Sequence, residues 1–275
     1  LQIAVTVVLH WLAEVVVQEI AMESTRQPKE YGLLFTAAMA RAAVAGIKTQ
    51  TRRLPTASNS LVDGVGISAK RWADMQFDWS RAVVDKGPSP AGNPGPYLHV
   101  PAGNGETWHR IYPRYQVGDR IWGRETWAVK RHEPCLEHER EYQKLCFPVI
   151  RYLADGQEIR HQGNRQTGDG IYGGLVEKAR PSIHMPRWAA RIVRDITAVR
   201  VERLQDISES DAMAEGIQKW PLGYRVEVSG APDHESRSFE IPQAAYRWLW
   251  NSINGAGSWN ANPPVIVIEF AGVQS

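Results

Sequence analysis

The chain has 275 residues, of which 43% are apolar and 23% charged, so it is long enough to bury a core of its own. Its formal net charge of +2 excludes a general nucleic-acid coat and leaves only a local patch for such a partner. The 2 cysteines do not indicate a disulfide framework and favour a reducing cytoplasm. The 11 tryptophans indicate a thick aromatic core or, less commonly, flat stacking surfaces.

The chain begins with an apolar stretch, Leu1–Ala21, that contains no Lys or Arg. A secretory signal would need a positively charged start. A membrane span would bury His10, Glu14 and Gln18, which lie at helical spacing and would form a polar stripe. We therefore expect residues 1–24 to be a helical N-terminal extension without a catalytic role, and we expect no membrane partner.

Strand and helix patterns follow one another closely after this extension. Tyr31–Phe35 resembles a strand, and Ala37–Ala45 is rich in helix formers, with Thr36 as a plausible N-cap. Gly46 stands where a glycine commonly ends a helix. Lys48–Arg53 then predicts a polar, extended segment.

The middle of the chain contains predicted loops and short strands. The proline- and glycine-rich run Gly87–Pro101 predicts a surface loop or insertion. Arg120–Trp127 alternates like a strand, and Val149–Leu153 is a second short strand. Residues 156–178 are polar and glycine-rich, which predicts another loop.

The C-terminal part combines two strands, two helices and a loop. In chain order these are a strand at Ile192–Leu204, a short helix from Ser208 to Glu215, a loop at Gln218–Ser238, a helix at Pro242–Ile253 and a buried strand at Val265–Phe270. Short strands separated by turns, about three short helices and no βαβ alternation predict an α+β fold built on a small mixed β-barrel.

The densest polar cluster is Gly46–Arg53. In an extended segment Lys48, Gln50 and Arg52 would share one face, and Thr51 would lie on the other. A lysine near other cations loses part of its preference for the charged form and can then act as a base. The alternative is a solvated basic turn, which the pattern alone favours.

Glu215 ends the short helix of the C-terminal part. The helix dipole disfavours a carboxylate at this end unless it has a partner. Glu215 is therefore either an exposed helix-end glutamate, the simpler interpretation, or the acid–base partner of a lysine.

Zinc-compatible side chains occur in one further segment, at His132, Cys135, His138 and Cys146. Their spacing matches no finger pattern, and charged residues interleave them. We expect no metal site and no cofactor.

The stretch Arg180–Ala189 is basic, aromatic and stiffened by proline. Arg187 and Trp188 offer phosphate contacts and stacking, so they are candidates for the wall of a base pocket. The same stretch could equally cover the core. Lipase elbows, P-loops and dinucleotide-binding glycine motifs are absent.

Several of these segments together resemble the ASCH domain, a relative of the PUA RNA-binding fold. Gly46, Lys48 and Arg53 match its G-x-K-x(4)-R signature, and Val265–Phe270 resembles its last strand. The resemblance, which extends to prophage-encoded ASCH-like proteins, implies one PUA-like domain over 31–272, a mixed β-barrel flanked by short helices. Insertions are then expected near residues 55–110, 128–147, 156–178 and 218–238.

The ASCH family includes a small bacterial N(4)-acetylcytidine amidohydrolase, whose catalytic groups lie in G-x-K-x-x-T-x-R and T-E-x-x-A-x-x-E segments. This chain carries Lys48 and Thr51 in the first context and Glu215 in the second, where Ser208 replaces the leading threonine. The resemblance implies that Lys48, Thr51 and Glu215 are catalytic. The candidate substrate-binding residues are Arg53, Trp122, Glu125, Arg187 and Trp188.

We therefore expect a cytoplasmic amidohydrolase that cleaves N(4)-acylated cytosine or cytidine without a metal. The alternative is an RNA-binding module or ribonuclease, in which Arg52 and Arg187 would contact RNA. A phage assembly protein is a third possibility, suggested by the prophage relatives alone. The sequence leaves the acyl group, the form of the cytosine and the oligomeric state open.

Overall fold

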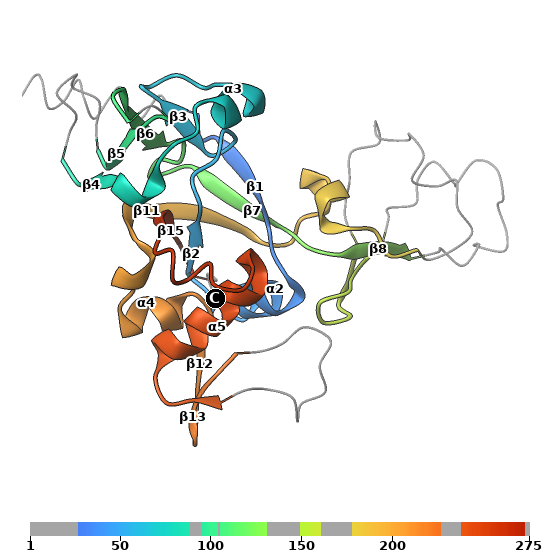
Figure 1. The fold of residues 1–275 in the computed structure, drawn as a ribbon. Helices are drawn as coiled ribbons and strands as arrows, with labels where there is room; N and C mark the ends of the chain where they lie inside the picture. Colours follow the sequence, from blue (N-terminus) through green and yellow to red (C-terminus); the bar gives the residue numbers. More distant parts are fainter. Residues whose placement is uncertain are drawn as a thin grey trace, which may run out of the picture. The chain divides into compact units, whose positions relative to one another are not determined.

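A computed structural model of the chain describes residues 27–87, 95–103, 105–130, 149–160, 178–226 and 238–272. The chain separates into two compact units, residues 1–30 and 31–275, and the fold below is that of the second unit. It is a mixed α+β fold with mostly strands, arranged in several sheets (Figure 1). The predicted α+β class is confirmed, but no closed barrel is found among the described strands. The predicted extension, 1–24, lies outside the described residues.

The central sheet has five strands in the order β1-β7-β11-β15-β2. The long strand β11 pairs antiparallel with β15, and β15 pairs antiparallel with β2, which forms one edge. These strands are β1 (Glu30–Leu34), β2 (Gln50–Arg53), β7 (Arg120–Arg124), β11 (Val193–Arg203) and β15 (Pro264–Phe270). Three of them, β1, β11 and β15, lie where the sequence predicted strands, within one or two residues at the ends. β2 is the last part of the segment predicted as extended, and β7 is the first part of the strand predicted at Arg120–Trp127.

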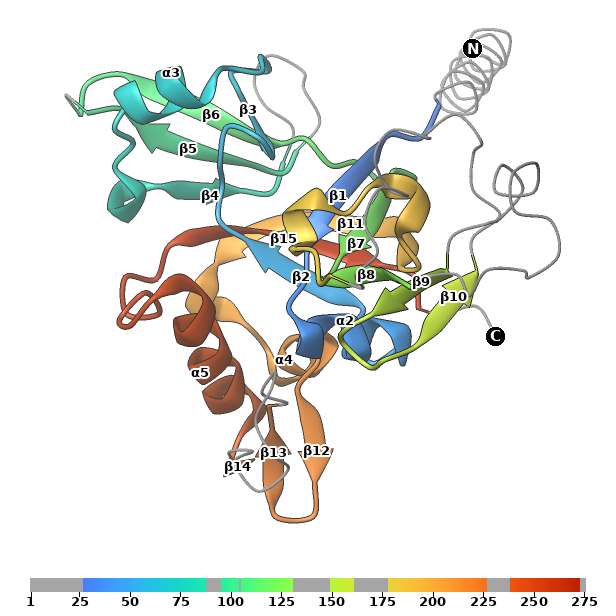
Figure 2. The same ribbon diagram turned by 90° about the vertical axis from the view of Figure 1, so that its right-hand side faces the viewer.

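Three smaller sheets accompany the central one. The four-stranded sheet has the order β3-β6-β5-β4 and the others β10-β9-β8 and β12-β13-β14, the last of which contacts α5 (Figure 2). Their strands are β3 (Ser60–Val62), β4 (Val83–Asp85), β5 (Tyr97–Pro101), β6 (Trp108–Pro113), β8 (Trp127–Lys130), β9 (Val149–Tyr152), β10 (Glu158–Arg160), β12 (Gln218–Trp220), β13 (Gly223–Arg225) and β14 (Ser238–Phe239).

Several predicted loops are thus partly wrong. The loop predicted at Gly87–Pro101 ends in β5, because Leu98 and Val100 are fully buried and Pro101 stands at the strand end, where its missing N–H is tolerated. The loop predicted at Gln218–Ser238 begins with a hairpin. The strand predicted at Arg120–Trp127 is two strands, β7 and β8, in different sheets.

Four α-helices are described: α2 (Ala37–Val44), α3 (Ala69–Asp74), α4 (Glu209–Ala214) and α5 (Pro242–Asn254). Short 3₁₀ turns are η1 (Trp79–Arg81), η3 (Ser182–His184), η4 (Arg187–Ala189) and η5 (Leu204–Asp206). Thr36 caps α2 as predicted, by accepting a hydrogen bond from the amide of Met39. No helix in the part of the chain that is described is long and apolar enough to cross a membrane.

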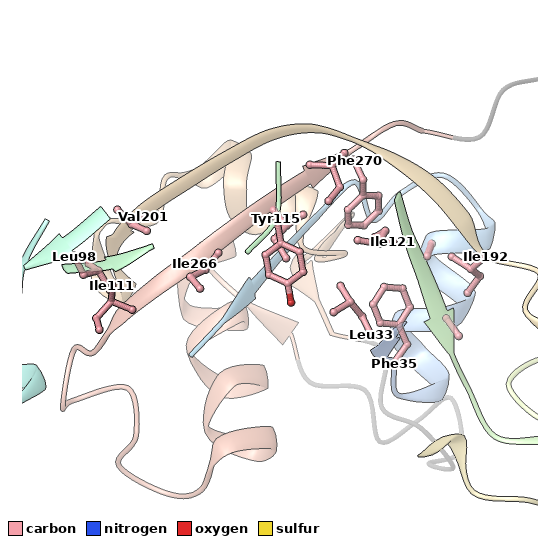
Figure 3. Packing of buried hydrophobic residues seen from close by; sticks show 14 of the residues in the cluster. Leu33, Phe35, Leu98, Ile111, Tyr115, Ile121, Ile192, Val201, Ile266 and Phe270 are labelled. Atoms are coloured by element: carbon pink, nitrogen blue, oxygen red, sulfur yellow. The ribbon is translucent and has the colours of Figure 1, made fainter. Parts of the chain in front are cut away.

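Strand β15 separates two hydrophobic clusters, which explains its apolar run Pro264–Ile268. Ile266, Ile268 and Phe270 belong to the first cluster, which also contains residues of β1 and β7 (Figure 3). Val265 and Val267 alternate with them and belong to the second cluster. The second cluster also receives residues of α4 and α5, namely Ala212, Ala245, Tyr246 and Trp250.

A capping box begins α4 and sets the position of the residues that end it. Ser208 Oγ accepts a hydrogen bond from the Asp211 amide at 3.1 Å, and Asp211 Oδ2 accepts one from the Ser208 amide at 3.4 Å. We expect Ser208→Ala to lower the free energy of unfolding by about 1 kcal/mol, measured by urea denaturation. An unchanged denaturation midpoint would contradict this role.

Candidate active site

Lys48 lies where the ends of two helices meet the start of β2. Gly46, with a φ of 73°, ends α2, and the amide of Lys48 donates to Ala42 O at 3.0 Å. The next amide, of Thr49, donates to Ala214 O at the end of α4 at 2.9 Å. These backbone bonds bring the ends of α2 and α4 to the same point.

The Lys48 ammonium group is fully enclosed. Nζ donates to Glu215 Oε2 at 2.7 Å, to Glu215 O at 3.0 Å and to Gln50 O at 2.7 Å, which uses all three of its hydrogens. The Lys48 side chain is 0% exposed and that of Glu215 is 3% exposed. The basic segment is therefore not a solvated turn, and that alternative is wrong.

The edge position of β2 makes the Gln50 carbonyl available to Lys48. Phe270 N donates to Thr49 O, and Thr51 lies opposite Ile268 in the ladder. Because backbone groups of successive residues point to opposite sides of a strand, the Gln50 carbonyl points away from β15, to the open edge. Lys48 Nζ thus contacts the peptide group that joins Gln50 to Thr51.

Glu215 caps the C-terminal end of α4 and is buried between two cations. Oε2 accepts from Lys48, and Oε1 accepts from Arg52 Nη1 at 3.2 Å. These partners offset the helix dipole, which opposes a carboxylate at this end. The interpretation of Glu215 as an exposed helix-end glutamate is therefore wrong.

Gly216 allows this close approach between α4 and Lys48. Its φ of 106° lies in the region that side chains rarely adopt. A Cβ at this position would stand 3.3 Å from Ala42 Cβ and 3.6 Å from Lys48 Cβ. A larger residue would strain the backbone and press against Ala42.

Burial changes the acid–base properties of Lys48. Desolvation lowers the pKa of Lys48 below its ordinary value, and the nearby charges of Arg53 and Arg52 add to this effect. Glu215 opposes it, through its negative charge and its hydrogen bond. Lys48 consequently loses its proton more readily than a solvated lysine.

Under the alternative RNA-binding hypothesis Arg52 would contact RNA, but its side chain is 0% exposed and it forms ion pairs inside the protein. Nη2 lies 3.2 Å from Asp211 Oδ2 and also pairs with Glu202, while Nη1 pairs with Glu215. Arg200 in turn pairs with Asp211 at 2.7 Å and with Glu202 at 3.1 Å. The donors of Arg52 are therefore engaged by carboxylates of the protein itself rather than offered to RNA phosphates.

Thr51 is buried on the face of β2 that the alternation predicted. Thr51 lies opposite Ile268, in the first cluster, whereas Arg52 lies opposite Val267, in the second. The Thr51 side chain is 0% exposed, and Oγ1 has no hydrogen-bond partner among the described residues. Thr51 Oγ1 is therefore an unsatisfied buried hydroxyl among the described residues, as Gln50 Nε2 is an unsatisfied buried amide in the same strand.

Arg53 shares the Thr51 face and is partly exposed. Its Nη2 donates to Leu34 O at 2.9 Å, which ties β2 to β1. Its Nε is buried and has no partner within the described part of the chain. Arg53 thus both anchors the sheet and keeps one donor available beside Thr51.

Trp122 and Glu125 have partners that indicate structural roles. A Cβ on Gly32 would come within 2.7 Å of the Trp122 ring, so the indole lies directly against β1, with Arg124 over it at 5.4 Å. Both carboxylate oxygens of Glu125 accept from Arg191, each at 2.8 Å. Desolvation raises the pKa of Glu125, and Arg191 opposes this shift.

Arg187 and Trp188 lie in η4, beside a third hydrophobic cluster, which is formed by Trp127, Ile150, Tyr152, Met185 and Ala189. Trp188 packs edge-on against Trp127, with ring centroids 6.5 Å apart. Trp188 is partly buried against this cluster. The interpretation of the stretch Arg180–Ala189 as a cover for the core therefore applies to Trp188. The structure thus brings Lys48 and Glu215 to the peptide group before Thr51, but the Thr51 side chain lies on the opposite face of β2 from Arg52, and Oγ1 forms no hydrogen bond with Lys48 Nζ. Trp188 packs with a different cluster.

The zinc-compatible residues His132, Cys135, His138 and Cys146 lie outside the described residues. Within the described ranges, no group of three or more His, Cys, Asp or Glu side chains is arranged to hold a metal ion.

Comparisons of the chain with family models, with curated proteins and with solved structures found no match.

Proposed function

We propose that the protein is an ASCH-type relative of the PUA-like proteins and hydrolyses the N-acyl amide of N(4)-acylated cytosine or cytidine. The observation that carries the proposal is the buried Lys48–Glu215 pair at 2.7 Å, which contacts the peptide group of a threonine whose hydroxyl has no partner among the described residues. A base, its orienting carboxylate and an unused hydroxyl are the groups that nucleophilic amide cleavage requires.

Lys48 would act as the base in its neutral form. With three acceptors around Nζ, the resting side chain has the geometry of an ammonium group. Loss of one proton, which the lowered pKa of Lys48 favours, leaves a lone pair. It can accept the Thr51 proton if substrate binding brings together the two groups, which are not hydrogen-bonded at rest. Glu215 holds Nζ in place during this exchange.

The reaction then proceeds in two steps. Thr51 Oγ1 attacks the acyl carbon while Lys48 takes its proton; the C–N bond breaks, and that proton passes through Glu215 to the exocyclic nitrogen. Water next attacks the acyl ester on Thr51, which releases the carboxylate and restores the hydroxyl and the base. Arg53 Nε, buried and without a described partner, is suited to stabilise the oxyanion.

The substrate class can be tested with one acetyl group in three contexts: N(4)-acetylcytosine, N(4)-acetylcytidine and an RNA oligomer that carries one N(4)-acetylcytidine. We expect hydrolysis of the base and the nucleoside and little or none of the oligomer, because a net charge of +2 and a buried Arg52 give RNA phosphates little attraction. Chromatography of the products measures this. Preferred cleavage of the oligomer would contradict the small-molecule assignment.

A further inference from the structure

Glu215 needs a second cation because Lys48 bonds to only one of its oxygens. A buried carboxylate with an unpaired oxygen is strongly disfavoured, and the helix end adds an unfavourable dipole. Arg52 Nη1 supplies the missing donor to Oε1 at 3.2 Å. Lys48 and Arg52 together therefore determine how the Glu215 carboxylate is rotated about the bond that joins it to the rest of the side chain.

Arg52 is itself held by two acids on separate elements. Glu202 on β11 accepts from Nε at 3.1 Å, and Asp211 on α4 lies 3.2 Å from Nη2. Its guanidinium also lies over the Tyr246 ring of α5, 5.8 Å from the centroid. Contacts from three elements leave the planar guanidinium little freedom, a condition that a lysine at this position would not meet.

We infer that Arg52 is a positioning residue: it holds Oε1 of Glu215 so that Oε2 stays on Lys48 Nζ, while Glu202 and Asp211 hold Arg52. This role rests on the proposed function, since positioning matters only if Lys48 and Glu215 exchange protons with a substrate. Arg52 also contributes positive charge near Lys48, which favours the neutral amine.

The pH dependence follows from the groups around Lys48. The charged groups that act on Lys48 are Glu215, at the end of α4, and Arg52 and Arg53 of β2. The titratable groups that contact Arg52 from its other sides are Asp211 of α4, Glu202 of β11 and Tyr246 of α5. If neutral Lys48 is the base, activity rises with pH through the Lys48 pKa. Removing the Arg52 charge raises that pKa, so the rising limb moves to higher pH.

The test compares wild type, Arg52→Gln, Arg52→Lys and the control Arg203→Gln over a range of pH with N(4)-acetylcytidine as substrate. Arg203 is a suitable control because it lies on β11 and donates to backbone carbonyls, including Trp79 O and Asn262 O, and not to Glu215. We expect Arg52→Gln to lower kcat at least about tenfold. We also expect it to move the rising limb of the pH–activity profile to higher pH, by roughly half a pH unit. Arg52→Lys should keep the limb in place, and Arg203→Gln should not move it.

Crystal structures of wild type, Arg52→Gln and Arg203→Gln provide a readout that needs no substrate. We expect the Glu215 carboxylate to rotate away from Lys48 Nζ in Arg52→Gln and to stay in place in Arg203→Gln. An unmoved carboxylate, or a pH profile of Arg52→Gln that matches wild type, would overturn the positioning role. An inactive wild type with a rotated carboxylate in Arg52→Gln would instead refute the proposed function and leave Arg52 as the residue that orients Glu215.

Discussion

Replacing Thr51 by valine should abolish hydrolysis without destabilising the protein. The Thr51 side chain is fully buried, and Oγ1 has no partner among the described residues, so its removal breaks no observed hydrogen bond. A methyl group there relieves the cost of an unsatisfied hydroxyl, and the free energy of unfolding should stay equal or rise by about 1 kcal/mol. Turnover should fall by a factor on the order of 10³ or more, because the nucleophile is lost.

Two further variants make this prediction specific. Thr51→Ser keeps a hydroxyl at the same position and should retain measurable turnover. Thr197→Val makes the same chemical change at an exposed position of β11 and should leave turnover unchanged. If Thr51→Val turns over substrate like wild type, Thr51 is a packing residue and the proposed nucleophile is wrong.

Replacing Lys48 by methionine should remove both activity and stability. The methionine fills the same volume but leaves Glu215 Oε2 and the Gln50 carbonyl without the donor they have now. Removing one partner of a buried ion pair typically costs 3–5 kcal/mol, and we expect about 3 kcal/mol here because Arg52 still neutralises Oε1. Urea denaturation measures the loss, and the acyl-cytidine assay should show no turnover.

Lys219→Met is the matched control, since Lys219 is an exposed lysine on β12. It should change the free energy of unfolding by no more than about 0.5 kcal/mol and leave turnover intact. Lys48→Met with a stability equal to that of the control would show that the buried pair contributes nothing to folding. The contrast between Lys48→Met and Thr51→Val separates the residue that the fold needs from the one that only the reaction needs.

The strands of the central sheet could be predicted because their patterns are strong and local. β15 contains the apolar run Pro264–Ile268, which is buried on both faces, and α4 begins with a complete capping box. The loop predicted over β5 was wrong because a high proline content masked the buried Leu98 and Val100. Proline content is a local signal, whereas burial depends on the strands that lie alongside.

The candidate site could be predicted only in part, because some of its contacts join segments that lie far apart in the sequence. The alternation along β2 placed Arg52 and Thr51 on opposite faces, as the ladder with β15 confirms. Nothing in the sequence pattern indicated that Glu202 and Asp211 would enclose Arg52, since their pairing joins segments about 150 residues apart. Glu125 was selected without its partner Arg191, which satisfies both carboxylate oxygens.

The most direct measurement is the release of cytidine and acetate from N(4)-acetylcytidine by wild type and Thr51→Val, followed by chromatography. The proposed function predicts that wild type releases the two products in equal amounts and that Thr51→Val, folded to the same extent, releases neither. A folded wild type that releases no cytidine, or a Thr51→Val variant that releases it at the wild-type rate, would contradict the assignment of Lys48, Thr51 and Glu215 as an amidohydrolase site.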